Sequence, residues 1–285
     1  AGMAGEAAAQ ALREADANAS IGMLGDESHP PYDRPPLTKK LWKDGKEADI
    51  WRPIDKARAD VTLQRRAVKI DRAAHVVVDD KGDTWKYRKL LITTGGTPRK
   101  LPSGGDGFIY YRTFDDYQRL RESVKPGARI AVVGGGFIGS EIAAAMAMND
   151  CKVTMLFPDD ALGARVYPES LADAVTAYYR EKGVDVRAGV IVESGSGTAQ
   201  GAQLKLSDGS TLDADAVVAG LGITPNVQLA EAAGLKVDNG IVVNEHLQTS
   251  DPDIYAAGDV AAFPAPALGH RLRVEHENAA ITMGT

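Results

Sequence analysis

A glycine-rich turn between an apolar strand pattern and an alanine-rich helix pattern constrains this chain more than any other feature. Residues 129–147 read RIAVVGGGFIGSEIAAAMA, in which β-branched residues lead into Gly134, Gly136 and Gly139. Glycines at this spacing let the pyrophosphate of a dinucleotide approach the N-terminus of the following helix. The segment therefore predicts a strand, a tight turn and a helix that bind a dinucleotide.

The N-terminus repeats the second half of this pattern. Residues 2–5 (GMAG) align with residues 136–139 (GFIG), and small residues that favour a helix follow both. Gly2 and Gly5 then take the places of Gly136 and Gly139, so the sequence predicts two nucleotide-binding βαβ units. No strand pattern precedes Gly2, and we expect the chain to begin just after the first strand of its first unit.

Each unit also carries an acidic residue after its next strand. Asp159 follows the strand pattern KVTMLF, and Asp26 follows ASIGML, each about 20 residues beyond the last glycine. A carboxylate at this position accepts hydrogen bonds from a ribose 2′-hydroxyl and favours NADH over NADPH. Arg165 is the nearby cation that could weaken this preference.

Composition excludes several classes of protein. The formal net charge is −6, so no basic field is available for nucleic acid or for an anionic membrane. No apolar run is long enough for a membrane span, and no signal peptide is visible, which favours a cytoplasmic location, or a mitochondrial one in a eukaryote. The single cysteine, Cys151, cannot form an internal disulfide, and the histidines lack the spacing of metal ligands, so we expect no metal site.

The rest of the chain divides at two glycine-rich stretches. A boundary near Gly107 and a return after residues 222–226 separate a discontinuous domain, residues 1–107 and 226–285, from an inserted domain, residues 108–225. The proline-rich stretch that precedes residue 38 predicts a loop and then a short helix over residues 38–42. The last residues predict a final helix.

Six motifs, in order, resemble one family over the whole chain. RPPLTKKLW, LLITTGGTPR, VVGGGFIGSE, GLGITPN, IYAAGD and RVEH are similar to motifs of the FAD-dependent pyridine nucleotide oxidoreductases. Within that superfamily, the chain resembles the branch of apoptosis-inducing factor and the ferredoxin reductases of aromatic-ring dioxygenases. TTGGTPR, MLFPD and RVEH favour the side of apoptosis-inducing factor.

The resemblance implies an α/β fold with two Rossmann-like domains of the FAD/NAD(P)-binding, glutathione-reductase-like type, each with three ββα layers. It implies that residues 1–107 and 226–285 bind FAD and that residues 108–225 bind NADH. It also implies that the first strand of the FAD domain and the C-terminal domain of the family lie outside this sequence.

The resemblance also assigns the cofactor contacts. For FAD it implies pyrophosphate contacts from the first glycine turn, an acid on the adenosine ribose, an acid on the ribityl chain, and backbone amides of the last helix near the flavin C2 carbonyl. These residues are Gly2, Gly5, Asp26, Glu27, Arg34, Lys39, Val68, Thr94, Gly95, Gly258, Asp259, Glu275 and His276. For NADH they are Gly134, Gly136, Phe137, Ile138, Gly139, Glu141, Asp159 and Gly222.

Lys39 and Glu141 form the sharpest predicted pair. In the family, a lysine after the PPL motif and a glutamate after the glycine turn meet near the flavin N5, where a positive charge favours the reduced ring. The alternative is a surface lysine and a glutamate that favours the start of a helix. Phe137 is expected against the nicotinamide, or alternatively in the core, and His276 is a candidate acid or base, or alternatively a packing residue.

The resemblance implies a flavoprotein that takes hydride from NADH, similar to apoptosis-inducing factor, with ferredoxin, quinone or oxygen as the electron acceptor. One alternative is the ferredoxin reductase of a dioxygenase or monooxygenase system. Another is a redox-sensing interaction protein that dimerises when NADH reduces it. Glu277 stands where ferredoxin reductases often carry a tryptophan, which favours the readings other than ferredoxin reduction.

Overall fold

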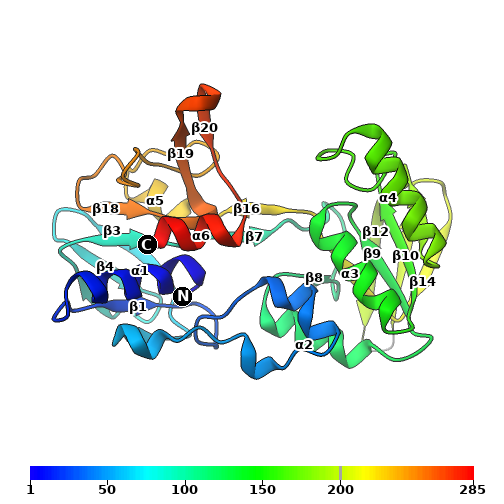
Figure 1. Ribbon diagram of the computed structural model, residues 1–285, viewed down its shortest axis with the longest axis horizontal. Helices are drawn as coiled ribbons and strands as arrows, with labels where there is room; N and C mark the ends of the chain where they lie inside the picture. Colours follow the sequence, from blue (N-terminus) through cyan, green and yellow to red (C-terminus); the bar gives the residue numbers. More distant parts are fainter. Residues whose placement is uncertain (199–200) are drawn as a thin grey trace. The chain divides into compact units, whose positions relative to one another are not determined.

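The computed structural model describes residues 1–198 and 201–285, which form two compact units (Figure 1). The first unit contains residues 1–33, 48–97 and 224–285, and the second contains residues 34–47 and 98–223. The chain passes between the units at residues 33–34, 47–48, 97–98 and 223–224, and the last two crossings lie in strands that pair with each other, β7 (Gly96–Pro98) and β16 (Ile223–Pro225).

The second unit is built on a five-stranded parallel sheet. Its strand order is β11–β10–β9–β15–β8, with all the neighbours in this order parallel. The strands are β8 (Ile109–Tyr110), β9 (Arg129–Val133), β10 (Lys152–Phe157), β11 (Asp185–Ala188) and β15 (Ala216–Ala219). Strand β15 is buried at every residue, as expected of a strand covered on both faces of a parallel sheet.

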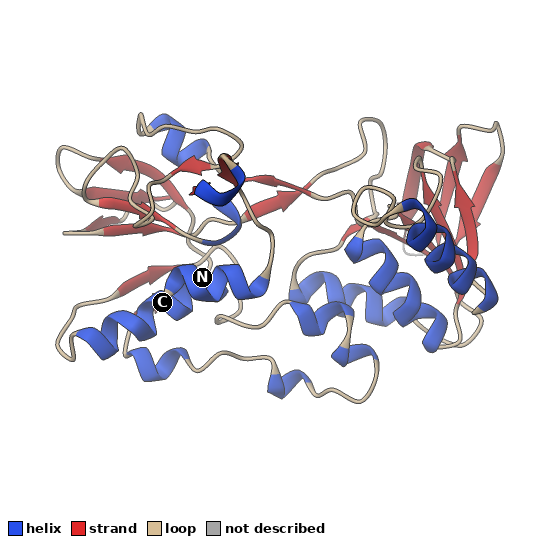
Figure 2. Ribbon diagram, turned by 45° about the horizontal axis from the view of Figure 1, so that its top comes forward, coloured by secondary structure: helices blue, strands red, loops and turns tan. Residues whose placement is uncertain are grey.

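Two further layers cover this sheet (Figure 2). Ala131 and Val133 of β9 pack with residues of an antiparallel sheet, β12 (Val192–Thr198), β13 (Gly201–Leu206) and β14 (Thr211–Ala214). The alternate residues Ile130 and Val132 point to the opposite face, where α3 contacts β9. The helices of this unit are α2 (Phe114–Ser123), α3 (Phe137–Met148) and α4 (Glu169–Glu181).

Residues 34–47 belong with the second unit, although the sequence predicted them in the discontinuous domain. They form two short 3₁₀ turns, η1 (Pro35–Thr38) and η2 (Lys40–Trp42), instead of the single helix expected over residues 38–42. Trp42 is 3% exposed, and its carbonyl accepts a hydrogen bond from Asn149 at the end of α3. These contacts span more than a hundred residues of sequence, so no local pattern reveals them.

The first unit contains four small sheets and helices at both chain ends. The parallel pairs are β1 (Gly22–Leu24) with β2 (Asp60–Thr62) and β6 (Leu90–Ile92) with β18 (Ile254–Ala256). The other two sheets contain β3 (Ala67–Asp71), β4 (Val76–Asp79) and β5 (Thr84–Lys86), and β17 (Ile241–Val242), β19 (Ala261–Ala265) and β20 (His270–Leu272). The unit also contains the turns and helices η4 (Ile54–Ala57), α5 (Gln228–Ala232), η5 (Gly258–Val260) and η6 (Pro266–Leu268), and most of η3 (Glu47–Asp49).

Helices α1 (Met3–Ala15) and α6 (Glu277–Gly284) pack against each other, and the two chain ends lie close together on them (Figures 1 and 2). Small residues allow this approach, since a Cβ atom on Gly284 would lie 2.5 Å from the carbonyl oxygen of Ala4. Glu6 of α1 is fully buried and pairs with Arg52. This buried charge has the partner that it needs to be stable there.

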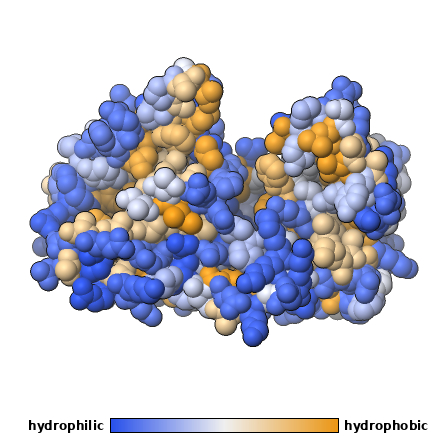
Figure 3. Space-filling model, in the orientation of Figure 1, coloured by the Kyte–Doolittle hydropathy of each residue, from blue (hydrophilic) through white to orange (hydrophobic). Residues whose placement is uncertain are grey.

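Most of the face drawn in Figure 3 is hydrophilic. On the face drawn in Figure 3, apolar residues form small, separate groups among charged ones. The exposed large apolar side chains include Leu171 and Tyr178 on α4 and Leu268 in η6. In the part of the chain that the structure describes, no helix combines the length and hydropathy needed to cross a bilayer.

Asp79 accepts hydrogen bonds within the β3–β5 sheet, and its ionisation makes the stability of the fold depend on pH at low pH. Burial alone would raise the pKa of Asp79, but hydrogen bonds from Arg65, Trp85 and two backbone amides lower it to about 2. Because this is below the unfolded value of about 3.9, the carboxylate stabilises the fold above pH ~4, and that contribution is lost as the pH falls towards 2.

We therefore expect Asp79→Asn to lower the melting temperature at pH 7 and to lose this effect as the pH approaches the folded pKa. Asp83→Asn is the matched control, because Asp83 pairs with the same Arg65 but is exposed. Thermal melts between pH 7 and pH 2 measure both. A constant difference between Asp79→Asn and the wild type over this range would contradict the assignment.

Candidate dinucleotide and redox site

The glycine turn of the second unit has the backbone geometry that the sequence predicted. Gly134 has a φ of +117°, and a Cβ atom there would lie 2.4 Å from the carbonyl oxygen of Gly220. A Cβ atom on Gly139 would lie 2.0 Å from the carbonyl oxygen of Gly134, so the turn closes only around glycine. Gly136 is the N-cap of α3, no side chain caps the helix, and the space where its Cβ atom would lie is open.

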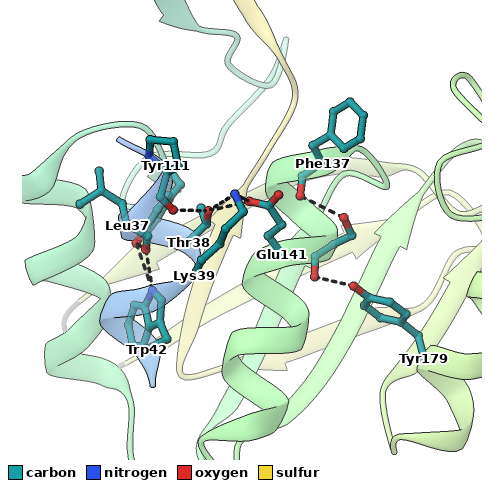
Figure 4. Close-up of polar contacts among 10 residues, drawn as sticks. Leu37, Thr38, Lys39, Trp42, Tyr111, Phe137, Glu141 and Tyr179 are labelled. Atoms are coloured by element: carbon teal, nitrogen blue, oxygen red, sulfur yellow. Dashed lines mark hydrogen bonds and ion pairs between the residues drawn. The ribbon is translucent and has the colours of Figure 1, made fainter. Parts of the chain in front are cut away.

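Lys39 and Glu141 meet in the second unit, as the resemblance implied. Lys39 Nζ lies 2.7 Å from Glu141 Oε2, and Figure 4 shows the two side chains pointing toward each other. Thr38, which the sequence analysis missed, donates its hydroxyl to the same oxygen at 2.6 Å. The pair is partly open to solvent, with 53% of the lysine side chain and 27% of the glutamate side chain exposed.

Buried hydrogen bonds hold the segment that carries Lys39. The carbonyl oxygen of Leu37 accepts from Trp42 Nε1 at 2.7 Å and also from the hydroxyl of Tyr111 (Figure 4). Trp42 packs edge-on against the ring of Tyr117 and lies under the guanidinium of Arg121. The backbone of the segment is therefore fixed before Lys39 reaches Glu141.

Phe137 lies on the surface and not in the core. It is the first residue of α3, and 58% of it is exposed. In Figure 4 its ring points away from the Lys39–Glu141 pair. Its neighbour Ile138 is 38% exposed, so the turn presents apolar side chains as well as backbone amides.

The predicted ribose acid of the second unit has a partner. Asp159 Oδ1 lies 3.0 Å from Nε of Arg165, the cation that the sequence analysis named. Both groups are accessible, with 30% and 75% of their side chains exposed. Gly222 has a φ of +80°, and its carbonyl oxygen accepts from the amide of Arg99 beside the two linking strands.

The glycine turn of the first unit lies against η5 and α6. Gly2 is the N-cap of α1 without a capping side chain, and the space beside it is open. A Cβ atom on Gly5 would lie 3.0 Å from Thr93 Oγ1. One on Gly258 would lie 3.1 Å from the Cβ atom of Ala4, so the structure brings the predicted pyrophosphate turn and η5 together.

The two acids predicted for the adenosine ribose both have partners. Asp26 forms an ion pair with Arg66 at 2.8 Å on the surface, and Glu27 accepts a hydrogen bond from the buried Tyr32. Val68 of β3 is 51% exposed. Arg34 lies in the second unit, where its Nη1 donates to the carbonyl oxygen of Arg112 at 3.0 Å.

Thr94 and Gly95 are fixed by Asn226 within the first unit. Thr94 Oγ1 donates to the carbonyl oxygen of Asn226, and the side-chain amide of Asn226 donates to the carbonyl oxygen of Thr94. The amide of Asn226 also donates to the carbonyl oxygen of Gly95, whose φ is +61°. The sequence placed Asn226 only at a domain boundary.

Arg273 joins the predicted ribityl acid to the start of α6. Its Nη1 donates to the backbone carbonyl of Asp259 at 3.2 Å and to Glu275 Oε1 at 2.8 Å. His276 is the N-cap of α6 and accepts from the amide of Asn278 through Nδ1. His276 therefore serves as a helix cap, and its predicted acid or base role remains a prediction.

Both glycine turns fit a dinucleotide. Each helix begins at a glycine without a capping side chain, so the first amides of α1 and α3 can bind pyrophosphate oxygens. Within residues 1–198 and 201–285, no group of three or more histidine, cysteine, aspartate or glutamate side chains could hold a metal ion. Burial raises the pKa of the Cys151 thiol, which disfavours the reactive thiolate.

Comparison with known proteins gives consistent matches over nearly the whole chain. The model of the pyridine nucleotide-disulphide oxidoreductase family matches residues 1–284. The anthranilate 1,2-dioxygenase system ferredoxin–NAD(+) reductase component of Burkholderia cepacia is 39% identical, with 96% of this chain and 70% of the relative covered. A chain in the crystal structure of the covalent putidaredoxin reductase–putidaredoxin complex has a TM-score of 0.94 and 33% identity, with 99% and 71% covered.

Apoptosis-inducing factor is also among the relatives. The mitochondrial apoptosis-inducing factor 1 of Dictyostelium discoideum is 33% identical, with 96% of this chain and 57% of the relative covered. Its identity is lower than that of the Burkholderia reductase component. The comparisons therefore support the ferredoxin reductase reading better than the reading placed first from the sequence.

Proposed function

Because this chain belongs to the pyridine nucleotide-disulphide oxidoreductase family, we propose that it is an NADH-dependent flavoprotein that reduces a ferredoxin. FAD and NAD(H) are the cofactors of the family. One observation carries the choice of acceptor. The Burkholderia reductase component is 39% identical to this chain, against 33% for the Dictyostelium apoptosis-inducing factor, at the same 96% coverage of the chain.

The first unit supplies the flavin site. The amides at the start of α1 bind the pyrophosphate, Asp26 or Glu27 binds the adenosine ribose, and Asp259 binds the ribityl chain. The start of α6 lies next to η5, where its amides can stabilise negative charge on a bound flavin. Bound FAD supplies a ring that accepts hydride from NADH and releases electrons one at a time.

The second unit supplies the NADH site. The turn around Gly134 admits the pyrophosphate, the α3 amides neutralise part of its charge, and Asp159 accepts hydrogen bonds from the ribose. Arg165 competes with the ribose for Asp159, but its side chain is exposed and can turn into solvent. Asp159 therefore stays available to the ribose hydroxyls, so NADH is the expected coenzyme.

Lys39 and Glu141 supply fixed charges beside the NADH turn. Their side chains are only partly desolvated, so the ion pair contributes little to stability on its own. Groups that are already oriented cost no reorganisation when charge moves during a reaction. We therefore assign the pair to hydride transfer and not to the stability of the fold.

A comparison of electron acceptors tests the proposed reaction. With NADH as donor, we expect the flavin-loaded protein to reduce a small acidic ferredoxin faster than a water-soluble quinone or oxygen. The rate should fall as sodium chloride rises, because exposed charges that guide association are screened. Equal rates with all three acceptors and no salt dependence would contradict ferredoxin reduction.

Apoptosis-inducing-factor-like redox sensing is the second candidate. Glu277, at the start of α6, favours it, since ferredoxin reductases often carry a tryptophan there. This reading predicts that the NADH-reduced protein persists in air and elutes earlier from a sizing column as a dimer. Reoxidation within about a second at an unchanged elution volume would exclude it.

A further inference from the structure

Thr38 makes a contact with Glu141 that the proposed function does not use. Its hydroxyl donates to Glu141 Oε2 at 2.6 Å, while Lys39 Nζ donates to the same oxygen at 2.7 Å (Figure 4). Thr38 is 5% exposed, so its hydroxyl cannot exchange this partner for bulk water. Both donors therefore act on one oxygen of the carboxylate.

The single hydroxyl proton of Thr38 has one well-placed acceptor. The other candidate, the carbonyl oxygen of Pro35, lies 3.3 Å away, against 2.6 Å for Glu141 Oε2. The β-branched side chain restricts χ1, and the buried Leu37 contacts fix the preceding backbone. Thr38 is consequently the more rigid of the two donors, because Lys39 is long and half exposed.

This arrangement leaves Glu141 Oε1 available. Among the residues that the structure describes, Oε1 has no hydrogen-bond partner, and the glutamate side chain is partly exposed. Glu141 lies on α3, five residues after the N-cap Gly136. An acceptor so close to a dinucleotide turn suits an N–H donor on the bound coenzyme.

We propose that Thr38 is a positioning residue, which fixes the plane of the Glu141 carboxylate and directs Oε1 to the carboxamide N–H of nicotinamide. This inference rests on the proposed function, because it requires NADH at the α3 turn. It adds that the hydroxyl of Thr38 determines how strongly the site prefers a carboxamide to a group without N–H. Lys39 supplies charge, and Thr38 supplies orientation.

The test compares two ligands on three proteins. The affinities of NAD⁺ and of 3-acetylpyridine adenine dinucleotide, in which a methyl ketone replaces the carboxamide, are measured by titration of the flavin-loaded protein. We expect the wild type to prefer NAD⁺ about tenfold, the effect of one hydrogen bond to a charged group. Thr38→Val should bring this ratio close to one, and Thr38→Ser should keep it, because serine retains the hydroxyl.

Thr154→Val is the matched control, since it removes a hydroxyl from β10 of the same unit, where the Thr154 hydroxyl donates to Asp185 at 3.4 Å. It should leave the ratio unchanged. The inference would be overturned if Thr38→Val kept the wild-type ratio of the two affinities, or if Thr38→Ser lost the preference for NAD⁺ as fully as Thr38→Val. Neither result would contradict the binding of NADH itself. If the wild type binds neither dinucleotide, both the proposed function and this inference are wrong.

Discussion

Glu141→Gln is expected to slow the reduction of bound flavin by NADH about 100-fold while the protein keeps its flavin and its melting temperature. Removal of one fixed group that stabilises developing charge typically has an effect of this size. The partly exposed ion pair contributes little to folding, so a loss of rate without a loss of stability is the expected pattern. Rapid-mixing absorbance under anaerobic conditions measures the rate.

Lys39→Met should produce a similar loss, and the double variant should be no slower than the worse single variant, because the two groups act together. Lys182→Met is the matched control. Its side chain is also 53% exposed and pairs with Glu181, far along the sequence from the glycine turn. An unchanged rate in Glu141→Gln, or an equal loss in Lys182→Met, would remove the pair from the mechanism.

Gly134→Ala is expected to abolish reduction by NADH without removing the flavin. The added Cβ atom would lie 2.4 Å from the backbone oxygen of Gly220, and the φ of +117° is one that residues with side chains rarely adopt. The turn must therefore open, and the α3 amides lose their position relative to the pyrophosphate. Flavin absorbance of the purified variant and NAD⁺ titration measure the two binding functions separately.

Gly127→Ala is the control that separates the strain of a positive φ from the steric clash expected in Gly134→Ala. Gly127 also has a positive φ, +80°, but no atom lies within 4 Å of the position that its Cβ atom would take. This variant should lose some stability and still bind NAD⁺. Loss of flavin from Gly134→Ala would show that the two nucleotide sites are not held by separate units.

Local patterns predicted the elements of the fold well where chemistry restricts the residue type. The strand, turn and helix around Gly134 and Gly139 are confirmed, since only glycine fits those positions. The α/β class of the chain follows from these elements and is confirmed by the comparisons.

Long-range packing decided what the sequence did not predict. Residues 34–47 join the second unit because the carbonyl oxygen of Leu37 accepts from Tyr111, 74 positions away, and that of Trp42 accepts from Asn149, 107 positions away. The prediction that Lys39 and Glu141 meet rested on the family resemblance, because nothing in their sequence spacing indicates it. Thr38 had no signal of its own, since a threonine in a loop is common and its role depends on a partner 103 positions away.

The sequence also did not predict that both candidate ribose acids would form ion pairs. Asp26 pairs with Arg66 and Asp159 with Arg165, so each carboxylate already has a cation before any ribose binds. Only Arg165 is close enough in sequence to have been suspected. The effect of such pairs on coenzyme affinity depends on side-chain geometry that no motif encodes.

Anaerobic titration of the flavin-loaded protein with NADH, followed in the visible spectrum, tests the central claim most directly. The account predicts that about one equivalent of NADH bleaches the flavin and that oxidised ferredoxin, added afterwards, restores the original spectrum. A flavin that stays oxidised in excess NADH, yet bleaches with dithionite, would contradict the account.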